Sequence, residues 1–314
     1  MSAKHHGAAL IDQMPSVHGR LEANAPLAKY TWFKAGGEAE VLFRPADQDD
    51  LSAFLAGVSN DVPLTVIGNA SNLLVRDGGI PGVVIRLGSG FSNIGISGTD
   101  IIAGSGAADL SVARKARDAG LAGLEFLSGI PGTIGGSVIM NAGAYGFEIK
   151  DVCTSVRAVD REGAAHEIAS DEMGFTYRHS DMPTGMIVTS ACFQGIPGEI
   201  AEISNRMETI QNEREVTQPV RTLTGGSTFQ NPPGYKAWEL VDQAGCRGLR
   251  RGGAMVSELH CNFLINTGGA TATDLEGLGE EVRRRVFEKS GISLEWEIKR
   301  IGSLGDKDVK EIGR

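Results

Sequence analysis

A glycine-rich stretch without charged residues, 126–147, constrains the fold of this chain more than any other feature. Six positions between 125 and 146 are glycine, and most of the others are small or apolar. Glycine in an ordered apolar run costs backbone entropy, so the fold must need positive φ angles or very close backbone contacts there. Exposed N–H groups in such a turn can bind an anion without a basic side chain. The stretch therefore predicts either a cradle for a cofactor's diphosphate or a buried turn that lets two strands pack closely.

The composition is that of a globular protein with two or three domains. Of its 314 residues, 41% are hydrophobic and 22% are charged. The net charge of −9 argues against general binding of nucleic acid, which requires a basic face. No apolar run reaches the roughly eighteen residues of a membrane span, and the first residues lack the apolar core of a secretory signal. We therefore expect a cytoplasmic protein.

The cysteines and histidines give no sign of a metal site. Four cysteines are scattered along the chain without a CxxC pair, so neither zinc nor a disulfide framework is indicated. His5 and His6 belong to the N-terminal lead and are not expected to bind metal. The absence of a cysteine pattern is typical of a protein from a reducing compartment.

Hydrophobic periodicity predicts a mixture of helices and strands. We expect helices at 47–58, with Asp47 as the N-cap, and at 109–119, 198–214, 235–244 and 271–290. We expect strands at 39–43, 63–67, 83–87, 94–103 (a pair), 152–160, 166–169, 186–193, 254–266 and 294–301. On the last strand Glu295 and Glu297 would share one face, either for acid–base chemistry or as an exposed surface.

A second loop, Gly68-Asn69-Ala70-Ser71-Asn72, directly follows a predicted strand. Its amides and polar side chains could face a phosphate, although it is neither a Walker A motif nor a GxGxxG motif. The alternative is a plain β-turn. Together with the glycine-rich stretch, it suggests that the chain binds one extended dinucleotide.

Two polar residues are candidates for chemistry. Ser227 lies in GGSTFQNP, where a rigidly held hydroxyl could donate a proton; the alternative is an ordinary serine in a turn. Arg178 follows Tyr177 in a polar turn, and its guanidinium suits a carboxylate; the alternative is a surface arginine. No GxSxG motif is present, so serine-hydrolase chemistry is not favoured.

Seven stretches together resemble the UDP-N-acetylenolpyruvoylglucosamine reductase family. They are NAPLAKYTWFKAGG (24–37), GNASNLLVRDGG (68–79), residues 129–146, YRHS (177–180), GSTFQNP (226–232), residues 253–266 and LEWEIKRIG (294–302). Any one of them is weak, but they follow the family's order, and the ordered set is specific. The segment after Arg178 is short and lacks the insertion by which one subgroup places a tyrosine over the substrate. The chain is therefore similar to the shorter subgroup.

The resemblance implies an α+β fold: an FAD-binding fold of the vanillyl-alcohol-oxidase type, with two FAD-binding α+β domains, plus a C-terminal α+β substrate domain. The expected limits are a flexible lead at 1–20, FAD-binding subdomains at 21–88 and 89–210, a substrate domain at 211–303 and a tail at 304–314. The implied cofactors are non-covalent FAD and NADPH as hydride donor. The implied substrate is UDP-N-acetylglucosamine enolpyruvate, which is reduced to UDP-N-acetylmuramate for peptidoglycan. Neither a nucleic-acid partner nor a membrane span is expected, and the protein would be a monomer or weak oligomer.

The resemblance also implies roles for individual residues. Ser227 matches the family's proton donor to C2 of the substrate, and Arg178 and Glu297 match its other two catalytic residues. The expected FAD contacts are Gly68, Asn69, Ala70, Ser71, Asn72, Leu73, Pro131, Gly132, Thr133, Gly135, Gly136, Ser137, Asn141, Ala142 and Gly143. The expected substrate contacts are Tyr177, Asn231, His260 and Asn262.

Three positions depart from the family pattern. Ala70 stands where glycine is usual, which would loosen the backbone's approach to the FAD diphosphate. Gln230 and Glu239 occupy positions that are often lysine, which leaves the partner of the UDP diphosphate open.

Another FAD-linked oxidase or dehydrogenase of the same fold, acting for instance on a hydroxy acid, is the alternative function, because a fold does not fix function. A flavin-binding protein without catalysis is a third.

Overall fold

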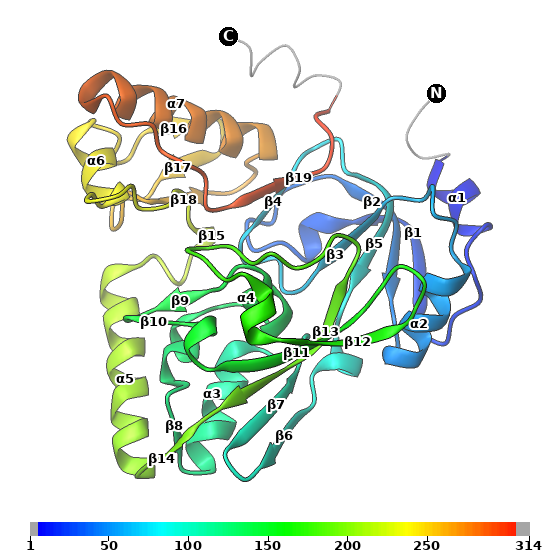
Figure 1. Cartoon of the computed structure of the whole chain (residues 1–314). Coiled ribbons are helices and arrows are strands. Elements are labelled where there is room, and N and C mark those ends of the chain that lie inside the picture. Colours follow the sequence, from blue (N-terminus) through cyan, green and yellow to red (C-terminus); the bar gives the residue numbers. More distant parts are fainter. Residues whose placement is uncertain (1–5, 306–314) are drawn as a thin grey trace. The chain divides into compact units, whose positions relative to one another are not determined.

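The computed structural model describes residues 6–305, the side chain of His6 excepted (Figure 1). Residues 1–5, which include His5, and residues 306–314 belong to the expected lead and tail and lie outside this range. Contacts divide the chain into two compact units. The first unit holds residues 1–23, 41–68 and 82–214, and the second holds 24–40, 69–81 and 215–314. The finer division into three domains stays a prediction.

A four-stranded sheet carries the N-terminal part of the first unit. Its order is β1 (Arg20–Pro26), β2 (Glu38–Arg44), β5 (Ile80–Arg86) and β3 (Leu64–Ile67). Helix α2 (Gln48–Gly57) begins where the sequence predicted, because the Asp47 side chain accepts a hydrogen bond from the Asp50 N–H at 2.9 Å. The expected apolar face, Leu51, Phe54 and Leu55, is buried against this sheet's core.

The described part of the expected flexible lead contains a helix, α1 (His6–Ile11). Leu10 and Ile11 pack against the core formed by β2 and α2, which includes Phe43 and Phe54. This part of the lead is therefore attached to the first unit, a feature that the periodicity of so short a segment did not reveal.

A five-stranded antiparallel sheet forms the rest of the first unit. Its order is β12 (Ala165–Ala169), β11 (Cys153–Val159), β13 (Ile187–Gln194), β7 (Asp100–Gly104) and β6 (Ile94–Ser97). The predicted strand pair at 94–103 is confirmed, with Gly98 at φ +60° in its turn. Helices α3 (Asp109–Asp118) and α5 (Ile200–Thr217) contribute Val112 and Met207 to the apolar core of this sheet.

Several short elements complete the first unit. The helical turns are η3 (Ser89–Phe91), η4 (Glu125–Gly129), α4 (Ile134–Ile139), η5 (Ile149–Asp151) and η6 (Ser170–Met173). The two-stranded pairs are β8 (Leu121–Ala122) with β14 (Ile196–Pro197), and β9 (Gly143–Ala144) with β10 (Phe147–Glu148). The glycine-rich stretch therefore folds as η4, α4 and the β9–β10 hairpin.

The second unit has a sheet of its own. The strand order is β15 (Leu223–Ser227), β18 (Phe263–Asn266), β17 (Ala254–Val256) and β16 (Arg250–Arg251), all antiparallel. Helix α7 (Ala272–Ser290) packs over strands β16 to β18, and α6 (Ala237–Gln243) packs beside α7 (Figure 1). A parallel pair, β4 (Leu73–Val75) with β19 (Lys299–Ile301), and the turn η2 (Leu27–Lys29) also belong to this unit.

Two expected strands of the second unit are shorter than the sequence suggested. Residues 254–266 form β17 and β18, separated by a turn in which the Ser257 hydroxyl accepts hydrogen bonds from the N–H groups of Leu259 and His260. Residues 294–301 form a strand only at β19, because its partner β4 is just three residues long. The predicted strand alternation of Glu295 and Glu297 is wrong, since residues 294–298 precede β19.

A half-buried carboxylate ties two distant segments of the second unit together. Asp77, in the loop after β4, accepts hydrogen bonds from the Ala272 N–H at 3.0 Å and the Thr273 N–H at 2.9 Å. The Thr273 hydroxyl donates a third bond to Asp77 at 2.8 Å. These donors lie in the first turn of α7, where a negative charge also interacts favourably with the helix dipole. Asp77 thus fixes the loop 69–81 to α7.

Replacing Asp77 by alanine should lower the free energy of unfolding by about 2 kcal/mol, because three donors at a helix start lose a charged acceptor. Asp77→Asn keeps one acceptor oxygen, so it should lose roughly half as much. Urea unfolding followed by circular dichroism measures both. Equal stability of Asp77→Ala and the wild type would contradict this account of the loop.

Candidate active site

The glycines of the glycine-rich stretch are required mainly by close contacts. A Cβ atom at four of them would come within 2.9 Å of another residue: Gly129 of Tyr145, Gly132 of Asp109, Gly135 of Ser105 and Gly143 of Phe147. Gly146 has a positive φ, +85°, in the turn of the β9–β10 hairpin. Close contacts and a positive φ angle, the two reasons that the sequence suggested, therefore both account for these glycines. The close contacts do not, however, join two long strands.

Gly136 differs from its neighbours. It lies in the first turn of α4, is exposed, and has no other residue within 4 Å of the position of a Cβ atom. Open space beside an uncharged backbone turn is what an FAD cradle requires, and a side chain here would reduce it. The residues present therefore fit this cofactor.

Within the first unit, the end of β3 lies against the glycine-rich stretch. A side chain at Gly68, directly after β3, would overlap the hydroxyl of Thr133, the N-cap residue that precedes α4. Thr133 is also buried and forms an isolated β-bridge with Ala108. The end of β3 and the start of α4 thus form one surface, as binding of a single dinucleotide would require.

An acidic residue, Asp109, is fully buried beneath this loop. One carboxyl oxygen accepts a hydrogen bond from the Ser137 hydroxyl at 2.9 Å, and the other has no partner. Burial raises the pKa of Asp109 to about 7, although the bonds from Ser137 and the Gly132 N–H act in the opposite direction. A carboxyl that is partly protonated at neutral pH thus contacts two of the predicted FAD-binding residues.

Asn141 and Arg178 belong to one connected turn of the first unit. The Asn141 amide donates to the Glu148 carboxylate at 3.0 Å and to the Thr176 carbonyl at 2.9 Å. Arg178, two residues beyond Thr176, has φ +58°, a left-handed conformation that is costly for a residue other than glycine. Its guanidinium donates to the Gly143 carbonyl at 3.1 Å and lies 4.9 Å from the Tyr177 ring centre. The glycine-rich stretch therefore holds Arg178 in place.

The loop 69–73 belongs to the second unit. Ala70 is buried and has φ +49°, in the region where glycine is favoured. A left-handed alanine costs roughly 1–2 kcal/mol, so alanine in place of the family's usual glycine strains the backbone at this position. The Asn72 amide donates to the Glu297 carbonyl at 3.1 Å, and the Lys299 N–H donates to the Asn72 carbonyl at 3.0 Å. Asn72 thereby anchors the segment that carries Glu297.

Ser227 and Glu297 are held close together in the second unit. Ser227 is the last residue of β15, half-buried, after a register shift at two glycines. The next residue, Thr228, accepts a hydrogen bond at its carbonyl from the Glu297 N–H at 2.8 Å. Two of the three residues expected to be catalytic are therefore joined through one backbone contact, and the third, Arg178, belongs to the first unit.

The expected substrate contacts of the second unit differ in their surroundings. The buried Asn262 side chain accepts a hydrogen bond from the Phe229 N–H at 3.0 Å and donates one to the Phe229 carbonyl at 2.8 Å. It so fixes the loop after Ser227. Asn231 is exposed, and its side-chain oxygen accepts from the Ala237 N–H at the start of α6. The His260 ring packs against the rings of Trp238 and Phe263, and burial lowers its pKa. The loop-fixing role of Asn262 was not visible in the sequence.

Comparison with known proteins identifies the chain as an FAD-linked oxidoreductase and also specifies its family. Residues 39–169 match the model of an FAD binding domain. Residues 218–301 match that of the UDP-N-acetylenolpyruvoylglucosamine reductase C-terminal domain. The chain belongs to the UDP-N-acetylenolpyruvoylglucosamine reductase family.

Full-length relatives support this assignment. The chain is 63% identical over 302 residues to the reductase of Parvibaculum lavamentivorans, covering 96% of this chain and 97% of that protein. It is 62% identical over 294 residues to the reductase of Azorhizobium caulinodans, covering 94% and 96%. The crystal structure of the Thermus caldophilus reductase matches with a TM-score of 0.79 at 37% identity, over 90% of this chain and all of that one.

These findings confirm the resemblance, the fold class, the oxidoreductase class and FAD as the cofactor. Between residues 6 and 305, no helix is long and apolar enough to cross a membrane. The roles of the individual site residues stay predictions.

The buried carboxyl of Asp109 makes stability depend on pH. Its pKa is about 7 in the folded protein against an ordinary value of 3.8, so between these two pH values the folded state binds a proton that the unfolded state does not. Stability should therefore fall as the pH rises. From pH 5 to pH 8 the wild type should lose about 2–3 kcal/mol more than Asp109→Asn, which mimics the protonated form.

Urea unfolding of both proteins at the two pH values measures this difference. Asp118→Asn, at the exposed end of α3, is the matched control and should follow the wild type. Parallel pH curves for Asp109→Asn and the wild type would show that Asp109 ionises normally.

Proposed function

We propose that this protein reduces UDP-N-acetylglucosamine enolpyruvate to UDP-N-acetylmuramate with NADPH, a step in making peptidoglycan precursors. The observation that carries the proposal is the hydrogen bond from the Glu297 N–H to the Thr228 carbonyl. It keeps Glu297 beside Ser227, and these are the positions that match two catalytic residues of the family. The near full-length identity to reductases of this name supports the same substrate.

When bound, FAD would supply the redox chemistry, a hydride transfer that links NADPH to C3 of the enolpyruvyl group. Gly68, Gly132, Thr133, Gly135 and Gly136 bind FAD largely through backbone. The other contacts are Asn69, Ala70, Ser71, Asn72, Leu73, Pro131, Ser137, Asn141, Ala142 and Gly143. Because the cradle has no charged side chain, backbone N–H groups bind the FAD diphosphate, as at other anion-binding turns.

Arg178 binds the substrate carboxylate. When C3 gains hydride, negative charge spreads from C2 into this carboxylate, so a guanidinium there binds the transition state more strongly than the ground state. The strained backbone of Arg178 and its bond to the Gly143 carbonyl support such a fixed orientation. Tyr177, Asn231, His260 and Asn262 contribute to the binding of the rest of the substrate.

Ser227 donates the proton to C2. The hydrogen bonds between Asn262 and the Phe229 backbone fix the loop just after Ser227, as a positioned acid requires. Glu297 polarises the substrate or helps to relay the proton. The proposal includes a cytoplasmic location, a monomer or weak oligomer, and the domain limits given above.

An anaerobic experiment tests both half-reactions. NADPH should bleach the flavin absorbance of the purified protein, and the enolpyruvyl substrate should then restore it with formation of the lactyl product. Bleaching without restoration would instead favour another FAD-linked dehydrogenase, acting for instance on a hydroxy acid. A protein that shows no flavin spectrum after addition of FAD would refute the cradle.

Ser227→Ala should slow reoxidation of the flavin by roughly 10²–10⁴-fold, because a positioned acid contributes that much. Reduction by NADPH should stay within about twofold of the wild-type rate, since Ser227 acts only on the enolpyruvyl substrate. Ser92→Ala, which removes an exposed hydroxyl of the first unit, is the control. Normal reoxidation in Ser227→Ala would remove this residue from the mechanism.

A further inference from the structure

The segment that carries Glu297 lies before β19 and depends on its neighbours for its position. Two backbone hydrogen bonds join it to the loop after Ser227: the Gln230 N–H donates to the Glu295 carbonyl and the Glu297 N–H donates to the Thr228 carbonyl, each at 2.8 Å. Between them lies an isolated β-bridge from Phe229 to Trp296. This short bridge sets the register of Ser227 against Glu297.

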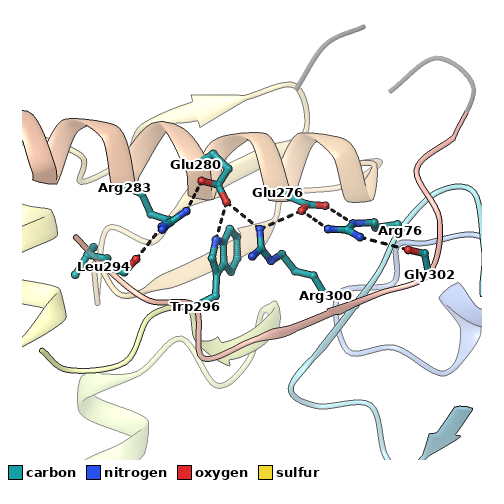
Figure 2. A network of polar contacts seen from close by, with 8 residues as sticks. All are labelled: Arg76, Glu276, Glu280, Arg283, Leu294, Trp296, Arg300 and Gly302. Carbon is teal, nitrogen blue, oxygen red and sulfur yellow. Dashed lines mark hydrogen bonds and ion pairs between the residues drawn. The ribbon is translucent and has the colours of Figure 1, made fainter. Parts of the chain in front are cut away.

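Trp296 is held on several sides (Figure 2). Its indole N–H donates to the Glu280 carboxylate at 2.8 Å, and the Arg300 guanidinium lies 4.5 Å from its ring centre. The ring of Phe229 is 5.3 Å away, in a tilted arrangement. A side chain with a directional bond, a cation contact and a ring contact has little freedom to rotate.

The groups that hold Trp296 are themselves fixed by ion pairs. Glu280 pairs with Arg283 at 2.7 Å and with Arg300 at 2.8 Å. Glu276, which is almost fully buried, pairs with Arg300 at 3.1 Å and with Arg76 at 2.9 Å. Figure 2 shows these contacts as a continuous chain along α7. The network therefore connects α7 to residues on both sides of Glu297: Trp296 before it and Arg300 after it.

The segment is also anchored two residues before Trp296. The Arg283 guanidinium donates to the Leu294 carbonyl at 2.7 Å, and Leu294 and Ile298 are buried. Glu297 thus lies between fixed neighbours. These neighbours fix the backbone position of Glu297.

Gly279 provides the space for the indole ring. A Cβ atom at this position of α7 would overlap the far edge of the Trp296 ring, well inside van der Waals contact. An indole is rigid, so it could not give way without moving the backbone of the segment.

The partner of Trp296 in the bridge is equally fixed. The Phe229 N–H donates to the Asn262 side chain, whose amide donates back to the Phe229 carbonyl. Phe229 is fully buried. Both sides of the bridge are therefore held in place, and the contact between them sets the backbone register of Ser227 against Glu297.

We propose that Trp296 is a positioning residue for the pair Ser227 and Glu297, and that Gly279 is required because it accommodates Trp296. This inference rests on the proposed function, in which both residues act on the enolpyruvyl substrate. Trp296 does not touch the substrate; it fixes the register of the two segments. Displacement of reacting groups by about 1 Å can reduce rates about 10²-fold.

Trp296→Phe and Gly279→Ala test the proposal in the FAD-loaded protein. Each should slow reoxidation of the NADPH-reduced flavin by the enolpyruvyl substrate by about 10–100-fold. Reduction by NADPH and the flavin spectrum should be unchanged. Glu288→Gln, which changes an exposed ion pair on the same helix, is the control and should react as the wild type does.

The double variant Gly279→Ala/Trp296→Phe gives a second test. A methyl group at 279 clashes with the indole ring but has more room beside the smaller phenyl ring, so the two effects should not add. The double variant should reoxidise no more slowly than Trp296→Phe alone. Multiplicative losses would show that position 279 acts independently of Trp296.

Amide hydrogen exchange supplies a readout that does not depend on turnover. In Gly279→Ala the N–H groups of Glu297 and Ile298 should exchange faster, while those of α7 stay protected. Unchanged exchange at Glu297 would overturn the proposal, as would reoxidation within twofold of wild type in both single variants. Equal slowing of both half-reactions would indicate a general structural defect and also overturn it. A wild-type protein that is never reoxidised would refute the proposed function itself.

Discussion

The hydrogen bond between the Glu297 N–H and the Thr228 carbonyl is the contact on which the arrangement of the second unit's functional residues depends. Residues 294–298 precede the three-residue strand β19, so no long ladder sets their register. Their order comes from one bridge, a tryptophan in a network of ion pairs and a buried asparagine. Most of these ion pairs are only partly buried, and their value lies in orientation more than in net stability.

The first unit uses a different means of fixing its functional residues. There the backbone itself is brought close to other residues, and glycine is the residue that permits it. Because Gly68 and Thr133 pack together and Asn141 fixes the turn of Arg178, loops far apart in sequence form one connected region. Such a region needs few charged groups, which agrees with a stretch of more than twenty residues that carries none.

Sequence reasoning succeeded where the signal is local. The N-cap at Asp47, the amphipathic helix at 271–290 and the hairpin at 94–103 all depend on residues within a few positions of one another. It failed at residues 254–266 and 294–301, because the ends of those strands are set by partners elsewhere in the chain. Family resemblance predicts roles for Ser227 and Glu297, and these roles stay predictions. The Asn262 contact with Phe229 spans 33 positions and leaves no pattern in the sequence.

The tight contact between Gly279 and Trp296 also restricts the order in which substitutions could have arisen. A chain with any side chain at 279 has no room for an indole at 296, whereas glycine at 279 tolerates a smaller residue there and leaves only a void. A chain that acquired tryptophan at 296 would therefore need glycine at 279 first, or at the same time. Once tryptophan is present, position 279 can no longer vary alone, so the two positions are expected to change jointly among related chains.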